Sequence, residues 1–133
     1  MDRLFLDANV LFSAAFKTDT RLLQLWKLKG VALYSSRYAL EEARINLTGE
    51  DQKTRLNKLA AALHLLEAGE GILQRGVSLP EKDAPILLAA IEARATHLLT
   101  GDVRHFGPYF GKKIARIEVT LPGEYLRKRN PVR

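Results

Sequence analysis

The sequence of 133 residues contains no cysteine. This absence excludes a disulfide-stapled fold, and it removes thiolates as metal ligands and as nucleophiles. It also fits a reducing compartment, so we predict a cytoplasmic protein. No apolar run reaches the roughly 20 residues of a membrane-spanning helix, and residues 1–10 lack the basic and then apolar segments of a signal peptide. We therefore expect neither secretion nor contact with a membrane.

Proline and glycine are also scarce, at five and nine residues, and aromatic residues make up 8% of the chain. With 47% hydrophobic and 27% charged residues, the composition is typical of a globular protein and not of a disordered one. The length suits one hydrophobic core, so we expect a single domain over residues 1–133. The net charge of +6 favours a polyanionic partner such as nucleic acid, although solubility explains the same excess of basic residues.

Short apolar segments alternate along the chain with segments of helical periodicity. Most of the predicted strands are apolar on both faces, which is typical of a parallel sheet covered by helices on each side. The predicted fold class is therefore α/β, a three-layer sandwich with a central parallel sheet of about five strands flanked by helices. The predicted strands are residues 3–6, 31–36, 72–79, 96–100 and 115–120, and the predicted helices are 10–16, 19–30, 37–47, 51–67, 83–95 and 122–129.

Two of these helices have predicted end signals. Asp19 or Thr18 is expected to cap the helix over 19–30, and Gly69 and Gly71 are expected to end the helix over 51–67.

Three aspartates stand at the ends of predicted elements, where a buried charge is costly unless it has a function. Asp7 directly follows the first strand, Asp102 follows the strand over 96–100, and Asp83 opens the helix after the strand over 72–79. In an open parallel sheet, the segments that follow strands gather at the carboxyl edge, where the crevice at the switch point binds ligands. We therefore expect the three carboxylates to converge.

A fourth carboxylate comes from the helix over 37–47, which carries the adjacent residues Glu41 and Glu42. Adjacent helical side chains point about 100° apart, so at most one of them faces the crevice. We favour Glu42, because it lies nearer the margin of the buried side. Crowded carboxylates repel one another unless they are protonated or bind a cation. A hard divalent cation such as Mg²⁺ or Mn²⁺ suits these oxygen ligands and supports phosphodiester hydrolysis.

Each acid also has a structural interpretation when it is taken alone. Asp7 and Asp83 could cap the helices that follow them, Asp102 could be an ordinary turn residue, and Glu42 could be a solvated helix residue. Independent caps would have no reason to gather at one edge of the sheet, so the set of four favours a site.

At these residues the sequence resembles the PIN-domain ribonucleases, and within them the toxin-like, VapC-type branch. The resemblance runs in order over nearly the whole chain. It is carried by "LFLDANVLFSA" (4–14), "SSRYALEEARINL" (35–47) and, most specifically, "DAPILLAAIEARATHLLTGDVRHF" (83–106).

The resemblance implies that Asp7, Glu42, Asp83 and Asp102 are the catalytic and metal-binding acids, with Asn9 and Thr100 as supporting polar groups. It implies an endoribonuclease that uses Mg²⁺ or Mn²⁺ and leaves a 5′-phosphate, with RNA as its substrate. It further implies a homodimer that is neutralised by a small antitoxin protein.

The resemblance has one departure. Some family members have a further aspartate or asparagine shortly after the fourth acid, where this chain has Arg104 and His105. The number of metal ions, one or two, therefore stays open. We interpret His105 as a residue of the crevice rim or a substrate contact in preference to a ligand, and His64 and His97 as structural.

Two other functions are kept as alternatives. One is a catalytically silent RNA-binding module with the PIN-like fold. The other is a phosphoacceptor signalling domain of flavodoxin-like topology, with Asp7 binding Mg²⁺ and Thr100 acting as a switch. The second is weaker, because its third predicted strand ends without an aspartate and its fifth ends without a lysine.

Overall fold

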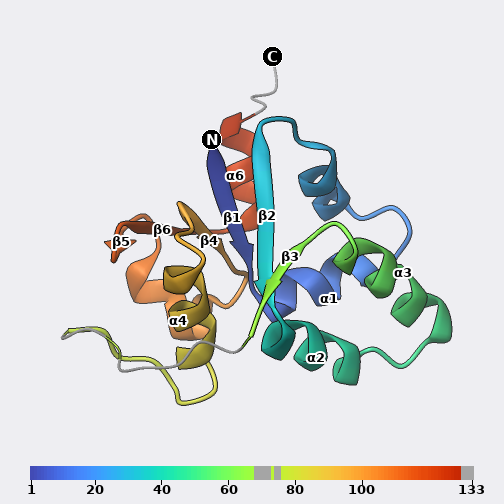
Figure 1. Cartoon of the computed structure of the whole chain (residues 1–133), viewed down its shortest axis with the longest axis horizontal. Coiled ribbons are helices and arrows are strands. Elements are labelled where there is room, and N and C mark those ends of the chain that lie inside the picture. The colour runs from blue at the N-terminus through green and yellow to red at the C-terminus, as the bar shows by residue number, and fades with distance from the viewer. Residues whose placement is uncertain (68–72, 74–75, 130–133) are drawn as a thin grey trace.

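The computed structural model describes residues 1–67, 73 and 76–129, and in these residues six strands form one sheet (Figure 1). The strand order is β3-β2-β1-β4-β6-β5. All neighbouring strands are parallel except β5, which pairs antiparallel with β6. The predicted α/β fold is therefore confirmed. The strands are β1 (Asp2–Leu6), β2 (Val31–Ser36), β3 (His64–Leu66), β4 (His97–Leu99), β5 (Lys113–Ile114) and β6 (Ile117–Thr120).

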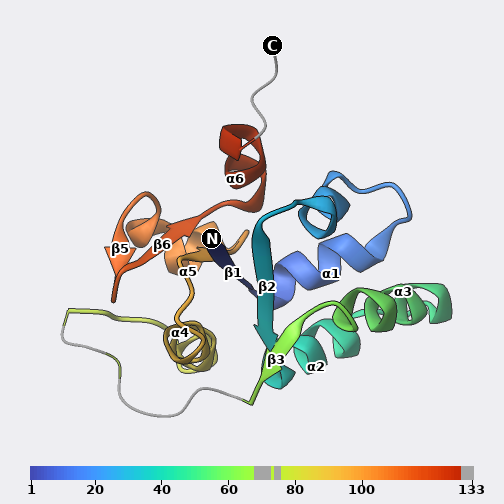
Figure 2. The ribbon, with the colours of Figure 1, turned by 45° about the horizontal axis from the view of Figure 1, so that its top comes forward.

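Helices lie on both sides of this sheet. Figures 1 and 2 show α1, α2 and α3 on one side of β2 and β3, and α4 on the other. The central strands β1 and β4 are apolar on both faces, and Leu4, Phe5, Leu98 and Leu99 are completely buried, as expected for a covered parallel sheet. The helices are α1 (Ala8–Phe16), η1 (Arg21–Lys27), α2 (Arg37–Asn46), α3 (Glu50–Ala60), α4 (Ala84–Glu92), α5 (Val103–Phe106), η2 (Gly107–Tyr109) and α6 (Pro122–Arg129).

The direction of strand addition reverses at β1, which lies between β2 and β4. The last residues of β1 and β4, Leu6 and Leu99, are register partners, and the backbone N–H of Asp7 donates to the carbonyl of Leu99 at 3.0 Å. The segments that follow β1 and β4 therefore begin side by side at the switch point, where ligands bind in open α/β sheets. In a flavodoxin-like sheet the first strand lies between the second and the third, so this strand order excludes the signalling-domain alternative.

The helix predicted over 51–67 is wrong in its second half. Helix α3 ends at Ala60, and His64–Leu66 form β3, whose residues pair in parallel with Tyr34–Ser36 of β2. The leucines at 63 and 66 fit helical spacing, but the backbone of His64–Leu66 pairs with β2, and the His64 ring stacks on Tyr34 with ring centroids 4.8 Å apart. Gly69 and Gly71, the expected end of that helix, lie outside the described residues.

Two other predicted elements also need correction. The segment predicted as a helix over 19–30 is the 3₁₀ helix η1, and it is capped by Thr20, whose hydroxyl accepts from the Leu22 N–H at 3.3 Å, and not by Asp19 or Thr18. The strand predicted over 72–79 lies partly outside the described residues, and its described residues, 73 and 76–79, are not in a strand. Within the described residues, none of the helices combines the length and apolar character needed to cross a bilayer.

Candidate metal centre

A cavity of about 610 Å³ opens at the carboxyl edge of the sheet, beside the ends of β1 and β4. All four predicted acids, Asp7, Glu42, Asp83 and Asp102, line it. They come from four separate segments, the turns after β1 and β4, helix α2 and the start of α4. The structure thus brings together the residues that the sequence predicted to converge. The other lining residues are Ala8, Asn9, Phe12, Ser13, Ala43, Asn46, Lys82 and Gly101.

Asp7 is the most deeply placed acid, with 4% of the residue exposed. It is the N-cap of α1, and its Oδ1 accepts from the Ala8 N–H at 2.6 Å. Its Oδ2 accepts from the Asn9 side-chain amide at 3.1 Å and from the Thr100 hydroxyl at 2.7 Å. The capping interpretation of Asp7 is therefore right, and the same carboxylate also lines the cavity.

Asn9 and Thr100 join the turn after β1 to the turn after β4. The Asn9 Oδ1 accepts from the Gly101 N–H at 2.7 Å, and a side chain at Gly101 would place its Cβ 3.3 Å from that oxygen. The Thr100 hydroxyl oxygen accepts from the Asp102 N–H at 3.0 Å. These bonds hold the segments that carry Asp7 and Asp102 in a fixed relation.

Helix α2 resolves the choice between the two adjacent glutamates in geometric terms. Glu42 lines the cavity, whereas Glu41 is exposed and forms an ion pair of 2.8 Å with Arg44. On the same helix, the Tyr38 hydroxyl donates to the Lys82 carbonyl at 2.7 Å, directly before Asp83 in the chain. This bond positions the start of α4 relative to α2.

Asp83 stands at the N-cap position of α4, but its side chain makes no capping hydrogen bond. The residue is 7% exposed, and its Oδ2 lies 2.8 Å from Nδ1 of His105. Among the residues that the structure describes, this buried Oδ2 has no partner with hydrogen-bond geometry. The simple capping interpretation of Asp83 is therefore wrong, because the carboxylate points toward His105 and away from the helix start.

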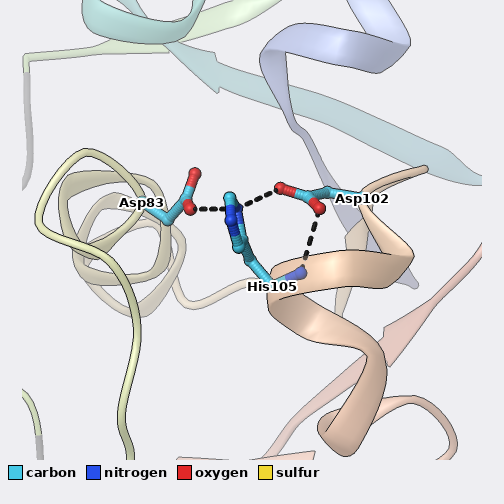
Figure 3. Close-up of side chains that lie close together, drawn as sticks. All are labelled: Asp83, Asp102 and His105. Atoms are coloured by element: carbon cyan, nitrogen blue, oxygen red, sulfur yellow. Dashed lines mark hydrogen bonds and ion pairs between the residues drawn. The ribbon is translucent and has the colours of Figure 1, made fainter.

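Asp102 caps the short helix α5 and also contacts His105. Its Oδ1 accepts from the His105 backbone N–H at 3.0 Å, and its Oδ2 lies 2.9 Å from the His105 Nδ1 (Figure 3). An ionised carboxylate only accepts hydrogen bonds, so with both aspartates ionised the Nδ1 between them would carry a proton and donate it to Asp102. The sequence suggested that His105 lies at the rim of the crevice. In the structure it lies between two of the predicted acids.

Burial and mutual repulsion disfavour the ionisation of Asp7 and Asp83. Burial raises the pKa of Asp7 to about 6, and the charges of Asp83 and Glu42 add to the rise, whereas the bonds from Thr100 and Ala8 oppose it. Burial also raises the pKa of Asp83, the charge of Asp102 adds to it, and His105 and Lys82 oppose it. A divalent cation would reverse this cost by compensating the carboxylate charges.

The donor set fits a hard divalent metal ion. Four carboxylates border one cavity, and a buried oxygen of one of them has no hydrogen bond in the described structure. Asp83, Asp102 and His105 each offer a ligand atom, and these three atoms lie within 4.8 Å of one another. Carboxylates with a neutral imidazole are ligands for Mn²⁺ and other first-row divalent ions, and carboxylates alone suit Mg²⁺.

The sequence did not predict the contacts of His105 with the acids, nor the place of Lys82 in the cavity wall. The contact of His105 with Asp102 was foreseeable, because residues three apart on a helical turn are neighbours. The contact with Asp83 was not, since it depends on how α4 packs beside α5. Lys82, the cation among the described lining residues, had no signal beyond its position beside Asp83.

An α/β fold with a cavity lined by four carboxylates at its switch point defines a candidate metal site. The PIN domain family matches residues 3–104, and the chain therefore belongs to the PIN domain family. Among solved structures, the chain is similar to a chain of VapBC2 from Rickettsia felis bound to a DNA fragment from their promoter. That match has a TM-score of 0.68 and 18% identity, and it covers 90% of this chain and 98% of the other. At this identity the likeness concerns the fold. No curated protein matches the sequence.

Proposed function

We propose that this protein is a metal-dependent endoribonuclease that hydrolyses phosphodiester bonds of RNA, with Mg²⁺ or Mn²⁺ as cofactor. The observation that carries the proposal is the convergence of Asp7, Glu42, Asp83 and Asp102 on one cavity at the carboxyl edge of the sheet. Membership of the PIN domain family and the net charge of +6 support a nuclease with a polyanionic substrate.

The four acids would bind the metal and would be the catalytic residues of the site. When bound, the metal would supply charge neutralisation at the scissile phosphate and a lowered pKa for a nucleophilic water. Asn9 and Thr100 would fix the Asp7 carboxylate through the bonds of 3.1 and 2.7 Å, so that it does not rotate when charge develops. Lys82 at the cavity wall would contact an RNA phosphate.

The fold also supports a proposal about partners. The structural neighbour is named VapBC2, and the family resemblance of the sequence is to VapC-type toxins. We therefore propose that this protein is the toxin of a toxin–antitoxin pair, that it binds a small antitoxin, and that it acts as a homodimer. RNA and an antitoxin are both found in the cytoplasm, which is the proposed location. Growth arrest on expression, relieved by the product of a neighbouring gene, would test this part.

The second candidate is a catalytically silent RNA-binding PIN-like module, which shares the fold and the basic surface. The two differ in whether the acids bind metal and cut RNA. Purified protein should cleave single-stranded RNA to products with a 5′-phosphate when Mn²⁺ or Mg²⁺ is added, and EDTA should stop the reaction. Asp102→Asn should abolish cleavage, whereas Asp51→Asn, on the exposed start of α3, should not. Cleavage that persists in excess EDTA would overturn the proposal, and RNA binding with neither metal binding nor cleavage would favour the silent module.

A further inference from the structure

We propose that His105 is a metal ligand through its Nδ1, and that it gives this site a preference for transition-metal ions over Mg²⁺. This inference rests on the proposed metal-dependent function and adds a nitrogen donor to the four carboxylates. It concerns the group formed by Asp83, Asp102 and His105, which we call the Asp–Asp–His group.

The separations within the Asp–Asp–His group are those of neighbouring ligands in a coordination shell. The Nδ1 of His105 lies 2.8 Å from the Oδ2 of Asp83 and 2.9 Å from the Oδ2 of Asp102 (Figure 3). In an octahedral shell with bonds of about 2.1 Å, adjacent ligand atoms are about 3.0 Å apart. The two measured separations match this edge length.

The buried Oδ2 of Asp83, whose contact with the His105 Nδ1 at 2.8 Å lacks hydrogen-bond geometry, is the second observation that indicates a ligand. Asp83 is 7% exposed, and its Oδ2 has no hydrogen bond within the described residues. A buried carboxylate oxygen without a hydrogen bond costs free energy, and the ion-pair contact with His105 does not supply that bond. A cation placed among the three atoms would satisfy Asp83, Asp102 and His105 together.

The imidazole is held in place for this function before any ion binds. The backbone N–H of His105 donates to the Oδ1 of Asp102 at 3.0 Å, at the start of α5. The His105 side chain is 24% exposed, so its ring can still exchange a proton with solvent. A ligating His105 would therefore need little reorganisation.

Ligation changes the proton count in a defined way. The Nδ1 proton must leave so that the lone pair can bind the ion. A charged ring releases this proton to solvent and keeps the proton on Nε2. A neutral ring that carries its proton on Nδ1 loses it there and takes up one on Nε2, so it releases none overall. The ring nitrogen then bonds the ion in place of the hydrogen bond to Asp102. His105 stays neutral when it is bound, as a ligating histidine must be.

A nitrogen donor changes which ions the site favours. Imidazole binds first-row transition metals more strongly along the series from Mn²⁺ to Ni²⁺, whereas Mg²⁺ prefers carboxylate, carbonyl and water oxygens. Loss of His105 should therefore weaken Mn²⁺ binding more than Mg²⁺ binding. A purely structural His105 would affect both ions equally.

Pulsed EPR of the full chain with Mn²⁺ tests the ligation directly. Protein labelled with ¹⁵N-histidine should show hyperfine coupling between Mn²⁺ and ¹⁵N. His105→Asn should lose the coupling, and His64→Asn should retain it, because His64 is exposed on β3 and does not belong to the group of ligand atoms formed by Asp83, Asp102 and His105. If His105→Asn does not fold, coupling that persists in both His64→Asn and His97→Asn assigns the ligand to His105, the third histidine of the chain.

Calorimetric titration of the same proteins with Mn²⁺ and with Mg²⁺ tests the preference. His105→Asn should weaken Mn²⁺ binding roughly tenfold and Mg²⁺ binding by less than about threefold. Mn²⁺ binding and RNA cleavage without nitrogen coupling would overturn this inference and leave the proposed function intact. Failure of the wild-type protein to bind either ion would overturn both.

Discussion

The hydroxyl of Thr100, after β4, donates a hydrogen bond of 2.7 Å to the carboxylate of Asp7, after β1. The same oxygen accepts from the Asn9 side-chain amide at 3.3 Å and from the Asp102 N–H at 3.0 Å. Thr100 is completely buried, so no water replaces these bonds. One threonine thus fixes the relative positions of two of the proposed metal ligands.

Replacing Thr100 with valine keeps the shape of the side chain and removes all three bonds. We expect Thr100→Val to lower the free energy of unfolding by about 1–3 kcal/mol, because buried polar partners are left unsatisfied. The pKa of Asp7 should rise further, since the bond from Thr100 lowers it. Urea unfolding in EDTA measures the first effect. Thr100→Ser, which keeps the hydroxyl, should retain most of the stability, and equal losses in the two variants would contradict the bonding scheme.

Stability without metal should depend on pH through Asp7. Its pKa is 3.8 in the unfolded reference and about 6 in the folded protein, so the folded state holds the proton more tightly. Ionisation of Asp7 therefore costs no stability below pH 3.8, and the cost grows as the pH rises and is complete above pH 6. The shift of about two pKa units corresponds to a loss on the order of 3 kcal/mol.

Asp7→Asn removes this titration and isolates it from the other acids. In EDTA, the unfolding free energy of wild type minus that of Asp7→Asn should fall between pH 4 and pH 7 by up to about 3 kcal/mol. Denaturant unfolding at each pH measures the difference. A difference that stays constant across this range would show that Asp7 does not titrate there.

The sequence predicts the fold well where an apolar strand and the acid that follows it can both be recognised from a short segment. Asp7 at the end of an apolar strand and Asp102 after another strand must meet if β1 and β4 are neighbours, and Leu6 and Leu99 are register partners. The extent of β3 was not predictable in the same way. Three residues are too few to show strand periodicity, and the leucines at 63 and 66 continue the helical stripe of α3.

The site was predictable in its acids and not in its histidine. Three of the four carboxylates stand at the boundaries of elements, and Glu42 lies within a helix that follows a strand, so the sequence pattern indicates all four positions. His105 and Asp83 are 22 residues apart in the sequence, and they meet only because α5 and the start of α4 pack together. No local pattern reports such a contact.

Lys82 should contribute to RNA binding through charge. It lines the cavity beside Asp83 and is exposed, so it can reach a phosphate. In EDTA, RNA affinity should fall steeply with salt, and Lys82→Gln should weaken binding and reduce the slope of log affinity against log salt by roughly one counterion. Lys58→Gln, on the exposed part of α3, should leave the slope unchanged. Fluorescence anisotropy with labelled single-stranded RNA measures both, and affinity that is flat with salt would remove the basic surface from the mechanism.

Asp83→Asn separates a metal site from a set of helix caps. Burial and the charge of Asp102 raise the pKa of Asp83, so removal of its charge relieves repulsion in the metal-free protein. The side chain makes no capping hydrogen bond that the substitution would lose, and the amide can still lie beside the Nδ1 of His105.

We therefore expect Asp83→Asn to be inactive on RNA and yet to unfold in EDTA at or above the wild-type temperature, with a gain on the order of 1 kcal/mol. Mn²⁺ at about 100 times its Kd should stabilise wild type by about 2.7 kcal/mol, because it binds only the folded state, and it should stabilise Asp83→Asn much less. Asp51→Asn, an acid on α3 outside the cavity, should respond to Mn²⁺ as wild type does. If Asp83 served only to start helix α4, neither wild type nor Asp83→Asn would respond to the metal, and the substitution would leave cleavage unchanged. Thermal unfolding of the three proteins with EDTA and with Mn²⁺ distinguishes these outcomes. Only if Asp83 binds the ion does its loss reduce the stabilisation that Mn²⁺ gives to the folded protein.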